Sequence, residues 1–166
     1  LELNIMSKTL RDIINDTRNM IYNLRPMSFD DIGLEVTIER ALEKLESSET
    51  KKINFSVVGE SYKINPVIGI TLLRIIQEAC SNAIRHADCS VIKVVLNYQP
   101  GTIILSIEDD GKGFVYEENE CNCKADNSGF GLSMMRERVY LLSGKIDIHS
   151  KTNAGTKIQV EVPIAE

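Results

Sequence analysis

The first 27 residues carry a repeating pattern of apolar and polar positions. The apolar side recurs at alternating spacings of three and four, the pattern of a helix that packs along one seam in a coiled coil or helical bundle. The positions of this seam are Leu3, Met6, Leu10, Ile13, Thr17, Met20 and Leu24. One helix cannot bury such a seam alone, and Pro26 ends it by disfavouring helical backbone in the preceding residue. The alternative is a helix that folds back on its own domain.

The rest of the chain mixes helical and strand patterns without a regular strand-helix-strand repeat. The predicted helices are 34–45, a long one from Pro66 to about 88, and 132–144 capped by Gly144; the predicted strands are 53–59, 91–98, 102–109, 145–150 and 156–164. The stretch from Tyr116 to Ser128 has almost no apolar anchors and is predicted to be a mobile loop. This mixture predicts an α+β fold, a two-layer α/β sandwich.

Composition and charge limit the classes of partner. With 43% hydrophobic residues among 166, the chain can form one sizeable core, and its formal net charge is -5. An acidic surface does not neutralise nucleic-acid phosphates or anionic lipid, so we expect neither as a direct partner. No apolar run approaches the roughly 20 residues that cross a bilayer, and the first residues lack a signal peptide's basic and apolar regions. We expect a soluble domain whose only membrane link would be upstream segments of a longer parent chain.

Four cysteines bear on the cellular compartment. Cys80, Cys89, Cys121 and Cys123 form neither a dense disulfide framework nor a CxxC pair, which favours a reducing, cytoplasmic setting. A zinc or redox role would require them to converge in space, because a metal site needs both ligand number and spacing.

A row of polar residues follows one edge of the long predicted helix "LLRIIQEACSNAIRHAD". Glu78, Asn82 and His86 are spaced by four and lie at the boundary of its apolar half. A carboxylate and an amide one turn apart are well placed to hold a hydrated Mg²⁺ or a polarised water, because hard cations prefer oxygen ligands. The alternative is a solvated helix edge with an i,i+4 hydrogen bond.

Two glycine motifs downstream favour a ligand site. "EDDGKGF" follows a predicted strand and places Asp109 before Gly111 and Gly113, where missing Cβ atoms let the backbone approach a ligand. Asp109 could then accept a hydrogen bond from a flat ring. "SGFGLSMMRER" places Gly129 and Gly131 directly before a helix, whose free N–H groups and positive end suit an anion. "NAGT" precedes the last strand, and this order of motifs is hard to reach by chance.

The chain resembles the ATPase superfamily shared by histidine kinases, gyrase B, Hsp90 and MutL. Its "IIQEACSNAIRHA" resembles the N box, "DDGKGF" and "GFGL" the first two glycine boxes, and "NAGT" the last. "LRPMSFDDIGL", "RIIQEACSNAIRHA" and "GLSMMRERVYLLSGKIDIHS" also resemble the two-component sensor kinase subfamily typified by DegS, DesK and NarX. The resemblance implies the Bergerat ATP-binding fold (the GHKL type), with residues 1–27 as the second helix of a dimerisation hairpin and 28–166 as the catalytic ATP-binding domain.

The resemblance also implies roles for individual residues, with ATP and Mg²⁺ as cofactors. Asn82 would ligate the Mg²⁺ that bridges the nucleotide phosphates, and Glu78 would orient or deprotonate the attacking group or hold metal-bound water. Asp109 would accept from the adenine amino group, and Thr156 would support the adenine through a water. The remaining nucleotide-binding residues implied are Gly111, Gly113, Gly129, Gly131, Leu132 and His86, with the loop from Tyr116 to Ser128 as the ATP lid.

The chain departs from the subfamily in one respect. Members carry the phosphate-accepting histidine in a motif beginning with His-Asp on an upstream helix, whereas the only histidines here are His86 and His149. The resemblance therefore implies a protein-histidine kinase part that binds Mg-ATP, phosphorylates a histidine absent from this chain, and cannot label itself alone. Its implied partners are a response-regulator receiver domain, which makes the DNA contacts, and a second copy bound through the N-terminal helix.

Three other functions are compatible with the fold. A non-catalytic signalling adaptor would keep the nucleotide fold only to dimerise and dock partners, but intact Glu78, Asn82 and Asp109 argue against it. An ATP-driven clamp like gyrase B or Hsp90 needs transducer domains that this chain lacks. A serine-phosphorylating anti-sigma kinase fits poorly with the N-terminal seam and the "LRP" connector.

Overall fold

A computed structural model describes residues 33–46, 51–115 and 130–164, all within one compact unit. The predicted N-terminal helix and hairpin segment 1–27, the predicted loop from Tyr116 to Ser128 and Gly129 lie outside the described residues. The elements, in chain order, are α3 (Leu34–Glu46), β1 (Lys52–Val58), α4 (Pro66–Asn82), a π-helical turn (Ala83–Ala87), β2 (Val91–Gln99), β3 (Thr102–Asp109), α5 (Phe130–Leu141), β4 (Lys145–Ser150) and β5 (Thr156–Pro163).

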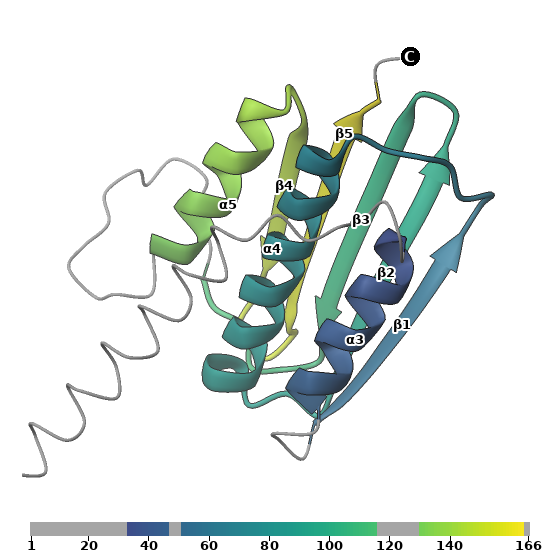
Figure 1. Cartoon of the computed structure of the whole chain (residues 1–166). Helices are drawn as coiled ribbons and strands as arrows, with labels where there is room; N and C mark the ends of the chain where they lie inside the picture. Colours follow the sequence, from purple (N-terminus) through teal and green to yellow (C-terminus); the bar gives the residue numbers. More distant parts are fainter. Residues whose placement is uncertain (1–32, 47–50, 116–129, 165–166) are drawn as a thin grey trace, which may run out of the picture. The chain divides into compact units, whose positions relative to one another are not determined.

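Five strands form one sheet in the order β1-β2-β3-β5-β4. Strand β1 pairs with β2 in parallel, and the other three pairs are antiparallel. Helices α3, α4 and α5 lie side by side on one face of this sheet (Figure 1). The predicted α+β two-layer sandwich is therefore confirmed.

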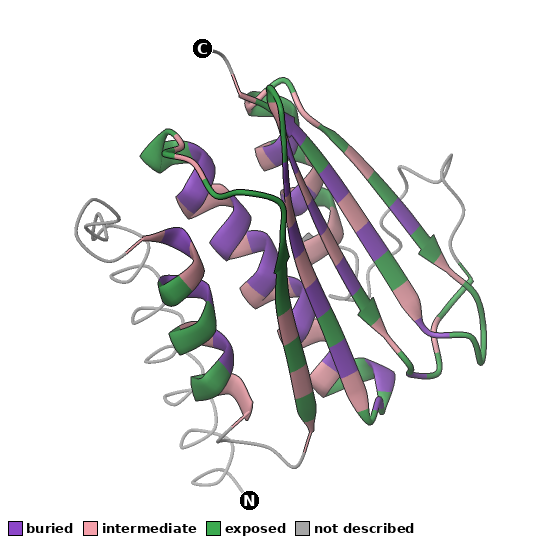
Figure 2. Ribbon diagram, turned by 90° about the vertical axis from the view of Figure 1, so that its right-hand side faces the viewer, coloured by how far each residue is buried: buried purple, intermediate pink, exposed green. Residues whose placement is uncertain are grey.

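The core lies between the sheet and the helices. Buried and more exposed residues alternate along the central strands, as Figure 2 shows, because successive side chains of a strand point to opposite faces. From the sheet, Ile92 and Leu105 are completely buried, and from α4 so are Leu72, Ile75 and Ile76. Burying each such side chain contributes about 1.5–3 kcal/mol, so α4 is fixed firmly on the sheet.

The start of α4 follows the sequence closely. Pro66 occupies the first turn, where its missing N–H costs nothing, and the Asn65 side chain accepts a hydrogen bond from the Val67 N–H at 2.9 Å. The continuous helical stretch to Ala87 is long and apolar enough, by length and composition alone, to cross a membrane. The prediction that no stretch of the chain approaches this length and apolarity is therefore wrong for these residues. Its buried residues face the sheet, as in the core helix of a globular domain.

The end of α4 differs from a simple helix. The last five residues, Ala83–Ala87, form a turn of π-helix, and Asp88 then adopts a left-handed backbone with φ of 52°. Asp88 also pairs with Lys51 across 3.7 Å, joining this corner to the start of β1. The wider π-helical turn changes the direction of the side chains that follow Asn82.

The end of α5 also differs from the prediction. The residue with a left-handed backbone there is Ser143, with φ of 55°, rather than Gly144. Gly144 still donates its N–H to the Val139 carbonyl at 3.0 Å. A Cβ on Gly144 would meet the Glu161 carbonyl oxygen at 2.6 Å, so glycine is needed at this position for close approach to β5.

Candidate functional site

Glu78 and Asn82 lie together on the last two turns of α4. The Asn82 side-chain N–H donates to a Glu78 carboxylate oxygen at 3.3 Å, and both residues are half-buried. This is the i,i+4 hydrogen bond expected if these residues simply form a solvated edge of the helix. It also leaves a carbonyl oxygen and a second carboxylate oxygen as potential ligands on one edge of the core.

Gly131 brings the start of α5 against this pair. A Cβ built on Gly131 would overlap the Glu78 carboxylate and lie 3.3 Å from the Asn82 side-chain nitrogen. Glycine therefore lets the α5 backbone approach this closely while the Glu78 carboxylate stays in its present position. The neighbouring Leu132 is half-buried in the same turn. The polar edge of α4 thus meets the positive end of a second helix, which favours bound anions.

Asp109 ends β3 in a half-buried position. Its carboxylate accepts hydrogen bonds from the Gly111 N–H at 2.9 Å and from the N–H and hydroxyl of Thr156. Burial raises the pKa of this carboxyl above its ordinary value, and the same hydrogen bonds oppose the rise by favouring the ionised form. The result is a carboxylate held at the sheet's end as a hydrogen-bond acceptor.

Glycines around Asp109 allow three segments to pack closely. A Cβ on Gly111 would overlap Ala87 at the end of the π-helical turn, and one on Gly113, whose φ is +55°, would overlap the Lys151 carbonyl oxygen. Gly155, with φ of +72°, lies against the Asp109 carbonyl in the same way. Hence the loop after β3 packs between the π-helical turn that follows α4 and the β4–β5 turn. The Lys112 N–H fixes this arrangement by donating to the Ala87 carbonyl at 2.7 Å.

Asp110 was not singled out from the sequence. One of its carboxylate oxygens accepts the backbone N–H groups of Ser90 and Val91, at 2.7 and 2.9 Å. These bonds, with that of Val91 strongest, lower the pKa of Asp110. Asp110 therefore joins the chain that leaves α4 to the loop that carries Asp109. An aspartate before glycine is a common turn former, but the partners, 19 and 20 residues away, leave no mark in the local sequence.

His86 occupies a different environment from Glu78 and Asn82. It is exposed and belongs to the π-helical turn, which breaks the spacing of four that would stack it above Asn82. Within the described part of the chain, no hydrogen bond or ion pair to His86 is found. Its contact with ribose or phosphate stays a prediction.

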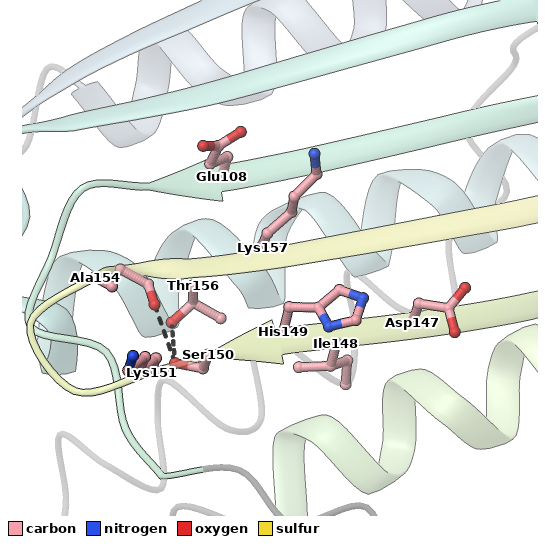
Figure 3. A pocket seen from close by; sticks show the side chains of 10 residues that line it. Glu108, Asp147, Ile148, His149, Ser150, Lys151, Ala154, Thr156 and Lys157 are labelled. Atoms are coloured by element: carbon pink, nitrogen blue, oxygen red, sulfur yellow. Dashed lines mark hydrogen bonds between the residues drawn. The ribbon is translucent and has the colours of Figure 1, made fainter.

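A shallow pocket of about 540 Å³ lies beside this site, along β4 and β5 (Figure 3). It shares Ser150, Gly155 and Thr156 with the surroundings of Asp109. The Ser150 hydroxyl lies 3.1 Å from the Gly155 carbonyl and 3.0 Å from the Thr156 hydroxyl. Ser150 is not predicted from the sequence, because a serine that ends an exposed edge strand has no distinguishing pattern.

Magnesium fits the donor set better than a thiolate-bound metal. Among the described residues, no group of three histidine, cysteine or acidic side chains could hold a metal ion. Mg²⁺ does not require one, since it commonly keeps several waters and takes one or two protein oxygens plus substrate phosphates. Cys80 and Cys89 are free thiols, and burial raises the pKa of Cys80 to about 12. Such a thiol stays protonated and is a poor metal ligand. Cys121 and Cys123 lie outside the described residues.

Known proteins share both the sequence motifs and this fold. Residues 68–166 match the family described as histidine kinase-, DNA gyrase B-, and HSP90-like ATPase. The signal transduction histidine-protein kinase/phosphatase DegS of Bacillus subtilis (strain 168) is 39% identical over 144 residues, which cover 85% of this chain and 37% of DegS. The oxygen sensor histidine kinase NreB of Staphylococcus carnosus (strain TM300) is 30% identical over 93% of this chain and 43% of NreB.

A solved structure supports the fold independently. The blue-light activated histidine kinase of Erythrobacter litoralis EL346 superposes with a TM-score of 0.63 at 18% identity, covering 79% of this chain and 42% of that one. This chain thus spans about two fifths of the length of the curated relatives it matches.

Proposed function

Because the chain belongs to the histidine kinase-, DNA gyrase B-, and HSP90-like ATPase family, with DegS and NreB among its relatives, we propose that it is the catalytic ATP-binding part of a sensor histidine kinase. It would transfer the γ-phosphoryl group of ATP to a histidine on an upstream helix. The observation that carries the proposal is the close approach of Gly131 to Glu78 and Asn82, because it forms the junction of a polar helix edge and a helix start that suits a magnesium-bound phosphate.

Each described residue has a task that its position supports. Asp109, whose carboxylate already accepts from three donors, would also accept a hydrogen bond from the adenine amino group. Asn82 would supply the protein oxygen to Mg²⁺, and Glu78 would orient the attacking group or a water. Bound Mg²⁺ would neutralise developing charge on the phosphate oxygens. Positioning and fixed charge supply most of the catalysis in such transfers.

The partners and setting follow from the same proposal. The phosphoryl group would pass from the histidine to the receiver domain of a response regulator. The longer protein would form a homodimer through the seam in residues 1–27 and act in the cytoplasm, with any membrane anchor upstream. The net charge of -5 fits a protein that leaves DNA contact to its regulator.

Thermal unfolding with Mg-ADP tests the binding site directly. Binding to the folded state increases the free energy of unfolding of the wild type by RT ln(1 + [L]/Kd), and so raises its melting temperature. Asp109→Asn should lose the preference for ADP over GDP, and Asn82→Ala should lose the dependence on Mg²⁺. Asp147→Asn, an exposed change on β4, is the control and should behave as wild type. If Mg-ADP left the wild-type melting temperature unchanged, the adaptor function would be favoured instead.

A labelling experiment tests the direction of transfer. With γ-labelled ATP, the chain alone should acquire no acid-labile phosphate, because the only histidines, His86 and His149, are not the proposed acceptor. Strong self-labelling at either histidine would contradict the proposal. A longer protein that includes the upstream helix should label itself, and Asn82→Ala in that protein should abolish the label.

A further inference from the structure

A row of polar side chains crosses the end of the sheet on its helix-facing side. Asp109 on β3 pairs with Thr156 on β5, and Thr156 pairs with Ser150 on β4. Directly paired residues of neighbouring strands point to the same face, and Ile92, the β2 partner of Asp109, is completely buried on that face. The three polar side chains therefore form a continuous line from the edge strand to the proposed purine site.

Hydrogen bonds join the line. The Thr156 hydroxyl bonds to the Asp109 carboxylate, and the Ser150 hydroxyl lies 3.0 Å from the Thr156 hydroxyl. The Phe114 N–H donates to the Ser150 oxygen at 3.0 Å. Figure 3 shows the Ser150 side chain directed toward Thr156 and the β4–β5 turn.

Proton counting gives the line a direction. Each hydroxyl has one proton to donate and two lone pairs to accept with. The Ser150 oxygen accepts from the Phe114 N–H and keeps a second lone pair, so this contact alone does not set the direction at Thr156. The direction is set at Asp109, because an ionised carboxylate can only accept: the Thr156 hydroxyl donates to it and is left to accept from Ser150. If Ser150 donates to Thr156 or to the Gly155 carbonyl, the single Thr156 proton remains available for Asp109. If Thr156 donated to Ser150 instead, Asp109 would lose one of its donors.

We propose that Ser150 is a positioning residue of the purine site, whose hydroxyl holds the Thr156 hydroxyl with its proton directed at the Asp109 carboxylate. This proposal takes the identity of the ligand from the proposed function. The hydrogen bonds between Ser150, Thr156 and Asp109 do not depend on it, because they are present without nucleotide. Ser150 would act on recognition from an edge strand, without touching the base, by keeping Asp109 in the form that accepts hydrogen bonds.

The surroundings of Asp109 make the effect measurable. Its titratable neighbours are Asp110 in the same loop, Cys80 on α4 and Cys89 before β2. Burial raises the pKa of both thiols, and backbone hydrogen bonds lower that of Asp110, so none of the three titrates between about pH 5 and 8. His149 and Lys157 are the sequence neighbours of Ser150 and Thr156, so their side chains extend from the opposite face of the sheet, away from Asp109 (Figure 3).

The first test needs no nucleotide. The pKa of Asp109 is measured by carboxyl ¹³C NMR in the nucleotide-free protein, with Asp109→Asn to assign the signal. In Ser150→Ala it should rise by about 0.5 unit, because the carboxylate holds its hydroxyl donor less well. Ser150→Thr, which keeps the hydroxyl, should restore the wild-type value. Ser106→Ala, on β3 but paired with Gln159 away from the line, is the matched control and should leave it unchanged.

The second test connects the line to binding. Mg-ADP affinity is measured by calorimetry from below the Asp109 pKa found in the first test up to pH 8, in a His86→Gln background so that this histidine does not contribute. As the pH is lowered and Asp109 becomes protonated, the affinity for Mg-ADP should fall. In this range Ser150→Ala should bind about threefold more weakly than wild type, and at pH 8 the two should bind equally. Thr156→Val removes the hydroxyl that connects Ser150 to Asp109. In this variant, adding Ser150→Ala should not change the pH dependence of Mg-ADP affinity any further.

The outcomes separate the two proposals. An unchanged or lowered pKa of Asp109 in Ser150→Ala would overturn the role of Ser150, since a lower value means that Ser150 competes for the Thr156 proton. Equal loss of affinity at every pH would likewise show a merely structural role. A raised pKa without any Mg-ADP binding by the wild type would uphold the hydrogen-bonded line and contradict the proposed function.

Discussion

At the scale of single residues, two adjacent aspartates have opposite environments. Burial raises the pKa of Asp109, whereas Asp110 is exposed and the N–H groups of Val91 and Ser90 lower its pKa. Under the proposed function the first carboxylate would accept a hydrogen bond from the ligand, and the second holds the chain around it. Two neighbouring residues of one motif would thus serve separately in recognition and in positioning.

The Asp110 contacts predict a pH-dependent loss of stability. Because its pKa is lower in the folded than in the unfolded state, Asp110 stabilises the fold above the ordinary value of about 4, and this contribution disappears as the pH falls through the lowered pKa. Asp110→Ala should therefore melt at a lower temperature than wild type at pH 7, and the difference should shrink toward pH 3. Asp147→Ala, an exposed change on the same sheet, should show neither effect.

Replacing Gly131 with alanine should weaken ligand binding without destabilising the fold. In Gly131→Ala the new methyl group displaces the Glu78 carboxylate, which is the end of a flexible side chain, so the fold can adjust at small cost. Alanine also favours a helix over glycine by up to about 1 kcal/mol. We expect an unchanged or higher melting temperature and weaker Mg-ADP binding, measured by calorimetry. Glu137→Ala, an exposed change on α5, should leave affinity unchanged.

The sequence singles out the candidate site residues that belong to motifs, but it does not single out the residues that support them. Glu78, Asn82 and Asp109 stand out because residue type and spacing together suggest chemistry. Ser150 and Asp110 act through partners 6 to 36 residues away, across strands whose pairing must be known first. Their roles depend on register, which a single sequence does not display.

At the scale of elements, helix and strand positions followed periodicity and turn residues closely, but two features did not. The parallel pairing of β1 with β2 connects strands separated by the whole of α4, and alternation along each strand says nothing about its neighbour. The π-helical turn at Ala83–Ala87 follows an unbroken helical pattern. It arises where the chain must turn toward β2 beneath the loop of Asp110.

Two glycines in turns have nearly equal φ angles but different surroundings, so alanine substitutions at the two positions separate the cost of backbone strain from the cost of close packing. Gly101 in the β2–β3 turn has φ of +71° and open space around an added Cβ, whereas Gly155 has φ of +72° and would meet the Asp109 carbonyl. Gly101→Ala should cost about 1 kcal/mol from backbone strain alone. Gly155→Ala should cost about 2 kcal/mol more, because backbone must move. Urea unfolding measures both, and equal losses would contradict the close packing.

At the scale of the whole molecule, buried thiols report how often the fold opens. Burial raises the pKa of Cys80 to about 12, and Cys89 is also buried and has a raised pKa. Alkylation by iodoacetamide requires a thiolate and access, so both cysteines should react slowly in native protein and rapidly in urea. Mg-ADP should slow the native reaction further. Mass-spectrometric mapping of the two peptides measures this, and fast native labelling would contradict the packing.

The last strand has a consequence for how this protein becomes competent during synthesis. Asp109 receives two of its three hydrogen-bond donors from Thr156, the first residue of β5. A nascent chain that has emerged from the ribosome only as far as β4 would already possess α4 and β3, yet its Asp109 carboxylate would lack the two donors that Thr156 supplies. Under the proposed function, nucleotide capture would therefore wait until β5 has emerged, and truncations that remove β5 should not bind Mg-ADP even though the glycine motifs before β4 are intact.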